Sequence, residues 1–396
     1  MKILHSADWH LGAKLHGQSR ESEQQAFLDW FLETLARVQP DILLLAGDIF
    51  DTATPPVSAQ RQYYHFLYQA AQQCDAIVII AGNHDSAAFL DAPQALLANM
   101  QIYVVGQAPQ NAAEAVFALE TKNGRAIVAA VPFLRERDIR CTQVGESLAD
   151  KASAIADGVR QYYQQAAEQA QKLRRGSEPL IALGHLFAAG GKTTDHDGVR
   201  DLFVGKLGHL SATIFPQCFD YVALGHLHLP QMVAQNPRIR YSGAPLMMGF
   251  GESVSEKHIV QLHFHERQPI IDAITVPVWQ KLRQLRGRQE TVIAEIEALL
   301  NDEAAVWLEI IIEEGVFDSA LNARLQDLVA NTSVKILRIQ QPSTQDFVAA
   351  LSDTRQLYEP QEVFAQRLEK TPFNDVEKAQ LTADFLTILQ QVHDAH

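Results

Sequence analysis

Five segments of the sequence carry side chains that bind metals or catalyse hydrolysis, and each follows an apolar run. In chain order they read SADWH (6–10), AGDIFD (46–51), AGNHD (81–85), LGH (183–185) and LGHLH (224–228). Carboxylate, carboxamide and imidazole groups are ligands for borderline divalent metals. One such motif alone indicates little, because turns and helix caps use the same residues. The ordered set DxH, GDxxD, GNHD, GH and GHxH instead predicts a single metal site.

The elements that must position these side chains are buried strands. DILLLAGD (41–48) and AIVIIAGNHD (76–85) begin with continuous apolar runs, which are typical of strands covered on both faces. Helix-like stretches separate the runs, and we expect helices within 24–37, 59–73 and 150–177. Further strands are expected at 126–133, 239–245 and 258–265. Strands that alternate with helices in this way favour an α/β layered fold.

The carboxyl ends of strands are where an open α/β sheet builds its ligand site, so the five segments are expected to meet there. Asp8 and His10 are two residues apart, as are His226 and His228. In an extended segment such pairs point to the same side. A glycine precedes the polar residues in four segments and lets the backbone approach closely. These glycines are Gly47, Gly82, Gly184 and Gly225.

Composition limits the class of protein. The 396 residues carry a formal net charge of -14, so bulk positive charge is excluded as the way this chain would hold nucleic acid. The three cysteines lie far apart, which argues against a disulfide framework or a zinc-thiolate site. No apolar stretch approaches the ~20 residues of a membrane span, and the N-terminus does not resemble a secretory signal. We therefore expect a cytoplasmic protein.

The composition shifts near residue 275. From ITVPVWQ (274–280) to VKILRIQQ (334–341) the sequence reads strand, helix, strand, helix, strand. Pro342 ends this part, and the remainder is helical, with an apolar stripe in 376–392. We predict three domains, at 1–274, 275–341 and 342–396. An apolar stripe of this kind either packs on the chain's own core or docks a partner.

The motifs DWHLG, AGDIFDT, AGNHDS and DYVALGHLH resemble those of the calcineurin-like binuclear metallophosphoesterases, and in particular the nuclease subunits of bacterial DNA repair complexes. The resemblance is strong to about residue 275 and rests beyond it on order and size. It implies two sheets flanked by helices, a smaller α/β capping domain and C-terminal helices. It also implies two divalent metal ions, one held by Asp8, His10, Asp48 and His228, the other by Asp48, Asn83, His185 and His226. A nitrogen and oxygen ligand set without thiolate favours Mn²⁺, with iron or Zn²⁺ as alternatives.

The implied reaction is two-metal hydrolysis of phosphodiester bonds. The metal ions would activate a water and neutralise charge on the phosphate. His84, protonated, is expected to stabilise that charge or to give a proton to the leaving oxygen, and Asp85 to orient its ring by accepting the other N–H. Asp51 has two open interpretations, loop capping and chemistry.

The resemblance further implies partners. It predicts a DNA substrate, cut as a double-strand exonuclease and as an endonuclease on hairpins and single strands. It also predicts an SbcC-like coiled-coil ATPase docked on the C-terminal helices, and a homodimer, within a heterotetramer, formed through 59–73 and 86–100. The candidates for DNA contact are basic residues of loops near the site, namely Arg20, Arg135, Arg137, Arg140, Lys192 and Arg200.

Two features depart from the pattern of these nucleases. Leu229 and Pro230 follow the last histidine where a basic residue is expected, and GAP (243–245) stands where GSP is commoner. Two other functions stay open on the sequence alone. One is a phosphoesterase acting on small phosphodiesters or phosphoproteins, since the metal site does not specify what carries the phosphate. The other is a non-catalytic scaffold, which the complete set of ligand residues disfavours.

Overall fold

A computed structural model describes residues 1–140, 147–188, 210–252, 256–300, 305–313 and 319–341, with 364, 368, 378 and 380–385. Contacts between residues divide the chain into two units. The first runs from Met1 to Gln341 apart from 315–317, and the second, which holds the rest, lies mostly outside the described residues. Most of the apolar stripe predicted in 376–392 lies outside the described residues. The three predicted domains stay a prediction.

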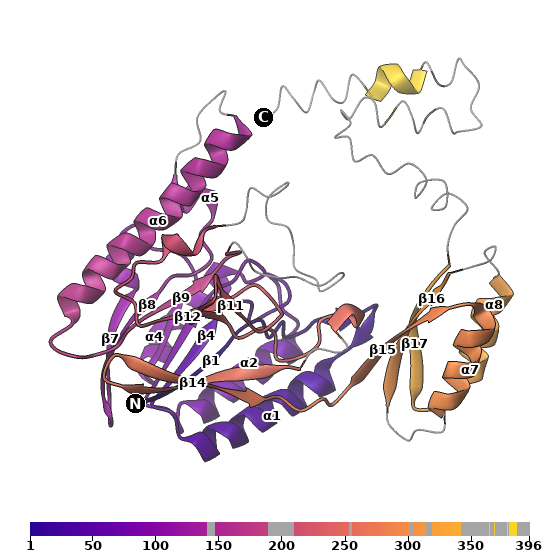
Figure 1. The fold of residues 1–396 in the computed structure, drawn as a ribbon, viewed down its shortest axis with the longest axis horizontal. Coiled ribbons are helices and arrows are strands. Elements are labelled where there is room, and N and C mark those ends of the chain that lie inside the picture. Colours follow the sequence, from indigo (N-terminus) through magenta and orange to yellow (C-terminus); the bar gives the residue numbers. More distant parts are fainter. Residues whose placement is uncertain are drawn as a thin grey trace. The chain divides into compact units, whose positions relative to one another are not determined.

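The first of two six-stranded sheets has the order β14-β13-β1-β4-β5-β6 (Figure 1). Its central strands β1, β4, β5 and β6 are parallel, while β13 and β14 extend it as an antiparallel pair. The bounds are Lys2–Ser6 (β1), Ile42–Ala46 (β4), Ala76–Ile80 (β5), Ile102–Val105 (β6), His258–His265 (β13) and Gln268–Thr275 (β14). The parallel order brings the carboxyl ends of β1, β4 and β5 to one edge.

The second sheet has the order β11-β12-β10-β9-β8-β7. Strands β8, β9, β10 and β12 are parallel, with β7 and β11 antiparallel at the two edges. The bounds are Val116–Thr121 (β7), Gly124–Ala130 (β8), Leu180–His185 (β9), Tyr221–Gly225 (β10), Gln231–Val233 (β11) and Asn236–Tyr241 (β12). In the register, Gly225 of β10 lies opposite His185 of β9, so these two strands end side by side.

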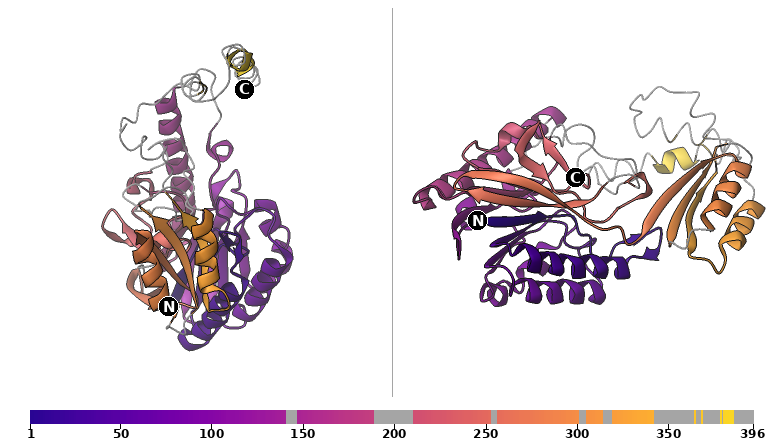
Figure 2. Two further views of the ribbon diagram at one scale, coloured as in Figure 1. Left: turned by 90° about the vertical axis from the view of Figure 1, so that its right-hand side faces the viewer. Right: turned by 60° about the horizontal axis from the view of Figure 1, so that its bottom comes forward.

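The two sheets pack face to face between helices, as Figure 2 also shows. Strand residues alternate between two cores, because successive side chains point to opposite faces. In β4, Leu44 packs between the sheets and Leu45 packs on the outer side. Helices α1 (Glu21–Val38) and α2 (Val57–Ala70) cover that outer side, and α6 (Leu148–Leu173) covers the second sheet. This confirms the predicted α/β layered fold with helices flanking two sheets.

A third, parallel sheet of three strands has the order β15-β16-β17. Its elements are β15 (Lys281–Gly287), α7 (Gln289–Leu300), β16 (Val306–Ile312), α8 (Ser319–Val329) and β17 (Val334–Gln340). The strand-helix-strand-helix-strand order was predicted correctly, but the first strand was placed too early. Residues up to Thr275 belong to β14 of the large sheet, and Pro277, which cannot donate a ladder hydrogen bond, follows.

Several short elements complete the framework. Residues 86–100, the second segment of the predicted dimer contact, form two short helices, α3 (Ala87–Asp91) and α4 (Gln94–Ala98), separated at Pro93. The hairpin β2 (Lys14–Leu15) and β3 (Gln18–Ser19) follows the first motif, and α5 (Glu136–Ile139) follows β8. Within the described residues, every helix is too short or too polar to span a bilayer.

Candidate metal centre

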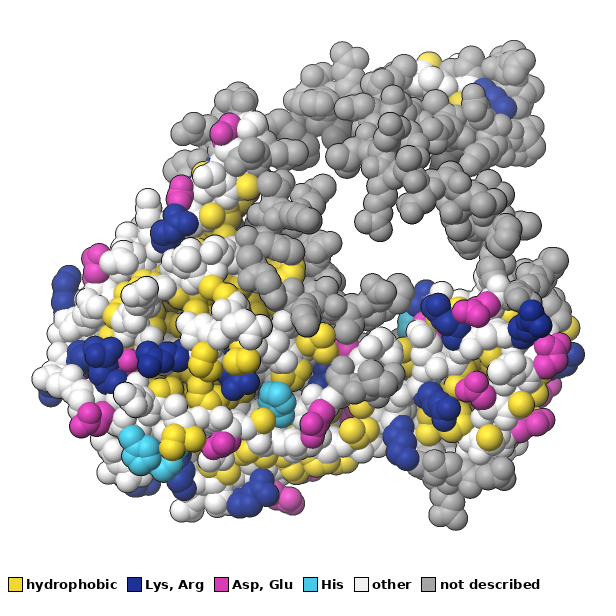
Figure 3. Space-filling model, viewed as in Figure 1, with side chains coloured by type: hydrophobic (Ala, Val, Ile, Leu, Met, Phe, Trp, Pro, Cys, Tyr) yellow, Lys and Arg dark blue, Asp and Glu magenta, His cyan; other side chains and the backbone are white. Residues whose placement is uncertain are grey.

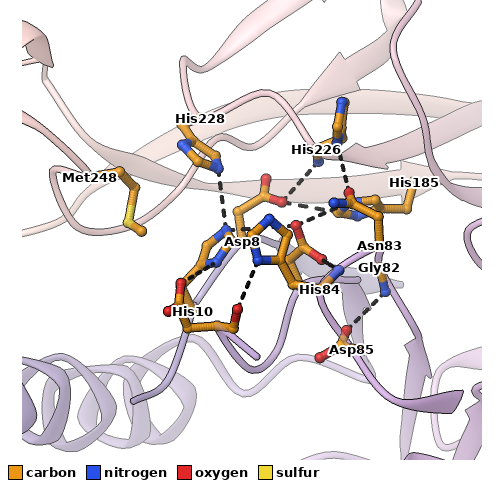
Figure 4. Close-up of polar contacts among 12 residues, drawn as sticks. Asp8, His10, Gly82, Asn83, His84, Asp85, His185, His226, His228 and Met248 are labelled. Carbon is orange, nitrogen blue, oxygen red and sulfur yellow. Dashed lines mark hydrogen bonds and ion pairs between the residues drawn. The ribbon is translucent and has the colours of Figure 1, made fainter. Parts of the chain in front are cut away.

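The five predicted segments meet at the carboxyl ends of β1, β4, β5, β9 and β10, and their side chains point toward one another (Figure 4). Asp8, His10 and His228 form one group whose ligand atoms all lie within 4.8 Å of one another. Asp48, His185 and His226 form a second such group. Atoms from both large sheets therefore build one buried site, as the strand-end argument predicted.

In the first group, the ring nitrogens of two histidines face each other. Nε2 of His10 lies 3.2 Å from Nε2 of His228. The carboxylate of Asp8 is fully buried, and its Oδ1 accepts the backbone N–H of His226 at 2.8 Å. Its other oxygen, Oδ2, is buried and has no hydrogen-bond donor within reach. An acceptor atom buried beside two imidazole nitrogens is suited to a cation.

In the second group, the side-chain oxygen of Asn83 lies between two histidines. Asn83 Oδ1 is 3.1 Å from His185 Nε2 and 3.0 Å from His226 Nδ1. His185 Nδ1 lies 2.9 Å from the carbonyl oxygen of Ala46 and must donate to it. That hydrogen bond leaves the lone pair of Nε2 on the side of the site, which is how metal-binding histidines are usually oriented.

Asp48 connects the two groups. Its Oδ2 lies 3.6 Å from His10 Nε2 and 3.2 Å from His185 Nε2. Its Oδ1 accepts the backbone N–H of His84 at 2.9 Å. Each of the two carboxylates, Asp8 and Asp48, thus has one oxygen bound to the backbone of another loop, and the second oxygen of Asp48 faces His10 and His185. The oxygen shared between the groups is where a bridging ligand of two metals would lie.

The pKa values of the two carboxyl groups move in opposite directions. Burial and the nearby charge of Asp48 raise the pKa of Asp8. Burial alone would also raise the pKa of Asp48, but the charge and hydrogen bond of His185 hold it well below the usual range. Protonated histidines alone thus do not keep both carboxylates ionised. A divalent cation would, so the donor set fits a metal.

The backbone at the site differs from the expectation. Asp8, His10 and Asp48 have φ angles of 55°, 46° and 48°, and His226 has 103°. These are left-handed conformations rather than the extended segments predicted for Asp8–His10 and His226–His228, so the side chains converge for another reason. Irregular loops follow the strands, and backbone hydrogen bonds join two of them: Asp8 N–H donates to Gly47 O and His10 N–H to Asp48 O, both at 3.0 Å. Uncommon φ values of this kind gather at functional sites.

A Cβ would clash at each of the four glycines, and the closest clashes are at Gly82 and Gly225. A Cβ on Gly82 would lie 2.1 Å from Asp48 Oδ1, and one on Gly225 would lie 2.0 Å from the carbonyl oxygen of Ala46. Both distances are far shorter than any real contact of a Cβ atom. The absence of a side chain at Gly82 lets the loops after β4 and β5 approach each other, and its absence at Gly225 lets the two sheets come together.

His84 is half-buried and forms a third group of possible metal ligands with His10 and Asp48; its ring centre lies 4.8 Å from that of His10. Its Nδ1 donates to the carbonyl oxygen of Asp51 at 2.8 Å. The Asp85 carboxylate instead accepts backbone N–H groups of Ile49, Phe50 and Gly82 at 3.1, 2.9 and 2.8 Å. The backbone of Asp51 therefore orients the His84 ring, in place of the expected Asp85 carboxylate. Asp85 ties the loop after β4 to the loop after β5.

Asp51, whose role the sequence left open, contacts two histidines of the site, His84 and His10. Its backbone oxygen holds His84, and its Oδ1 lies 3.3 Å from Nδ1 of His10. A carboxylate at Nδ1 favours a proton there and directs Nε2 of His10 to the metal side. The GDxxD spacing signalled this residue but not its two contacts.

The basic candidates for DNA contact are distributed differently. Arg20 is 3% exposed and its guanidinium binds Glu23 at 2.9 Å, so it does not offer a surface contact. Arg137 is exposed, Arg135 is half-exposed, and Arg140 pairs with Glu136. Lys192 and Arg200 lie outside the described residues. Figure 3 shows positive and negative side chains interspersed over one face of the described surface.

Comparison with known proteins agrees with the fold and the site. Residues 1–230 match the family described as calcineurin-like phosphoesterase, and residues 278–371 match the type 5 capsule protein repressor C-terminal domain. The chain is 34% identical to the SbcD subunit of the SbcCD nuclease from Escherichia coli (strain K12), with 100% of both chains covered. It is 37% identical to the corresponding SbcCD nuclease chain of Rhodobacter capsulatus, over 64% of each chain, and 33% identical to that of Bacillus subtilis, over 65% of each.

The matches extend over both the metal-site segments and the C-terminal part. The full-length identity favours a nuclease subunit over the two other functions that the sequence left open. The chain therefore belongs to the calcineurin-like phosphoesterase family and, within it, to the SbcD nuclease subunits, metal-dependent phosphoesterases with a binuclear site of His and Asp residues.

Proposed function

We propose that this chain is the DNA-cleaving subunit of a bacterial repair and recombination complex. It hydrolyses phosphodiester bonds as an exonuclease on duplex ends and as an endonuclease on hairpins and single strands. The observation that carries the proposal is the meeting of two His/Asp groups at Asp48 in a chain similar over its full length to a nuclease subunit. DNA cleavage in bacteria implies that the protein acts in the cytoplasm.

The proposed ligands follow the two groups. Asp8, His10 and His228 hold one ion, Asn83, His185 and His226 hold the other, and Asp48 contacts both. Support comes from Asp8 Oδ2, a buried acceptor without a hydrogen-bond donor, and from Asp48 Oδ2, which faces ring nitrogens of His10 and His185. Mn²⁺ is the proposed ion, because the set combines imidazole with oxygen ligands and lacks thiolate. Bound cations supply an activated water and positive charge against the phosphate.

His84 is the proposed general acid. Because Nδ1 already donates to the Asp51 carbonyl oxygen, the ring can give a second hydrogen bond only as an imidazolium, through Nε2. A proton held at Nε2 serves the phosphate oxygens and then the leaving ribose oxygen. Asp85 contributes by fixing the two loops that carry Asp48 and Asn83.

Contacts with DNA and with partner chains are part of the proposal. Arg135, Arg137 and Lys192 contact the DNA backbone, and residues 275–341 form a capping domain. A homodimer forms through α2, α3 and α4, where Val57, Tyr68 and Leu96 expose large apolar side chains at 70%, 60% and 68%. Residues 342–396 dock an SbcC-like coiled-coil ATPase. The relatives are named as parts of an SbcCD nuclease, which supports that partner.

A nuclease assay tests the proposal. The full chain, with Mn²⁺ and with or without the ATPase partner and ATP, is incubated with linear duplex DNA, hairpin DNA and a chromogenic phosphodiester. Cleavage of the DNA substrates, abolished by Asp48→Asn, is the expected result. Hydrolysis of the small diester with intact DNA under all conditions would instead identify a small-molecule phosphoesterase.

A further inference from the structure

His228 is contacted from two directions by a buried pair of opposite charges. Glu252 is fully buried and Lys257 is 3% exposed. Lys257 Nζ donates to Glu252 Oε2 and, at 3.0 Å, to the carbonyl oxygen of His228. The second carboxylate oxygen, Glu252 Oε1, lies 3.9 Å from His228 Nδ1. One ion pair therefore reaches both the backbone and the ring of the same residue.

The backbone around this pair holds each member in place. The N–H of Met248 donates to Glu252 Oε2 at 3.0 Å, and the N–H of Val276 donates to Lys257 O at 2.8 Å. The carbonyl oxygen of His228 accepts a second bond from Ala244 N–H at 3.1 Å. A buried ion pair is seldom more stabilising than apolar residues of the same volume. Its contacts with His228 suggest that it serves the position of that ring.

We propose that Glu252 and Lys257 are positioning residues for the metal ion that His228 binds. Nε2 of His228 faces His10, and Nδ1 faces the Glu252 carboxylate. A carboxylate on that side favours the tautomer with a proton at Nδ1 and keeps the lone pair at Nε2 available to a cation. Lys257 donates to the backbone carbonyl oxygen of His228, so the main chain that carries the ring is held in place as well. This inference rests on the ligand role proposed above for His228.

The Glu252→Gln variant removes the charge and keeps the size. Its control is Glu309→Gln, since Glu309 is also a buried carboxylate, 2% exposed, but binds Gln284, Arg338 and Gln340 in the three-stranded sheet. Co²⁺ is titrated into the metal-free full chain, and visible absorbance reports stoichiometry and coordination geometry. The wild type and the control are expected to bind two ions alike. In Glu252→Gln, one of the two ions binds about 10- to 100-fold more weakly.

A double variant, Glu252→Gln with Lys257→Met, separates positioning from stability. It leaves no unpaired buried charge, so its thermal unfolding is expected to lie near that of the wild type, while one Co²⁺ ion still binds weakly. Wild-type affinity for both ions in Glu252→Gln or in the double variant would overturn the inference. A wild type that binds fewer than two ions would overturn the proposed metal site itself, which is a distinct result.

Discussion

Replacing Gly225 by alanine tests how closely the two sheets must approach at the site. A Cβ at this position would lie 2.0 Å from the carbonyl oxygen of Ala46, in β4 of the facing sheet. Ordinary contact begins at 3.4 Å, so the sheets would have to separate there by about 1.4 Å to reach it. The obstacle is main chain, so no change of side-chain rotamer relieves it. The same oxygen accepts the hydrogen bond that orients the ring of His185.

The magnitude follows from these contacts. Overpacking a close-packed core costs about 1–3 kcal/mol, and losing the His185 hydrogen bond costs about 0.5–1.5 kcal/mol more. We expect the free energy of unfolding to fall by about 2–4 kcal/mol, which leaves a domain of this size folded. Ligand distances tolerate only about 0.2 Å. A shift above 1 Å therefore removes His185 or His226 from the metal, and activity should fall at least about 100-fold.

The assay measures urea unfolding, bound Mn²⁺ after dialysis, and nuclease rate. Gly184→Ala is the matched control, because Gly184 also precedes a proposed ligand but its Cβ would meet the hydroxyl of Tyr163 at 2.2 Å. Gly184→Ala alone should lose metal and activity, and adding Tyr163→Phe, which deletes that hydroxyl, should restore both. The remaining close contact, 3.1 Å to Leu224 Cδ2, is with the end of a flexible side chain. Gly225→Ala has no equivalent rescue. A Gly225→Ala protein with two bound ions and wild-type activity would refute the reasoning, since it would show that the facing strands yield.

Further predictions address the same site. His84→Ser should keep two bound ions and lose most turnover, since the ring is proposed to hold a proton and not a metal; reduced metal content would contradict this. The affinity of the His185 centre for Mn²⁺ should rise about tenfold per pH unit up to about pH 9, because Asp48 raises the pKa of His185 to about 9 although burial lowers it. The cation must displace that proton, and calorimetric titrations at pH 6.5, 7.5 and 8.5 give the slope. Chelation should leave the circular dichroism spectrum unchanged, because Asp8 and Asp48 each keep a backbone hydrogen bond without metal. A chain ending at Gln341 should stay folded and bind metal but not the ATPase, which a pull-down tests.

The sequence predicted the strands and the meeting of their ends because both depend on local pattern. Continuous apolar runs with a terminal glycine mark β4 and β5, and parallel strands bring their carboxyl ends to one edge. The short strand β6 and the edge strands β7 and β14 were not predicted. β14 is mostly polar or half-exposed and is stabilised by pairing with β13, which is a tertiary effect.

Contacts between loops were the least predictable part of the site. Asp85 follows His84 directly, so proximity in sequence suggested that its carboxylate orients the ring. In the structure that carboxylate accepts the backbone N–H groups of Ile49 and Phe50, more than thirty residues earlier in the chain. The His84 ring instead donates to the carbonyl oxygen of Asp51. Likewise Arg20 looks like a loop residue available to DNA, but it precedes α1 and is buried against Glu23. The Asp85 arrangement has no local signal, because it depends on how two loops pack. The Arg20–Glu23 pair is local, at i and i+3, but its burial is not signalled by the sequence.

The left-handed backbone conformations at the site explain why it requires the whole fold. Asp8, His10 and Asp48 adopt φ values that most residues avoid, and conformations of this kind cost of order 1–3 kcal/mol each. The hydrogen bonds between the loops after β1 and β4 offset this cost only if both strands are in register. The carboxylate oxygens bound to the N–H groups of His226 and His84 add the same condition for β10 and β5. Strand pairing and sheet packing thus set the ligand geometry before any cation binds. For this reason, adding a side chain at a glycine such as Gly225 should disturb the site as strongly as replacing a ligand.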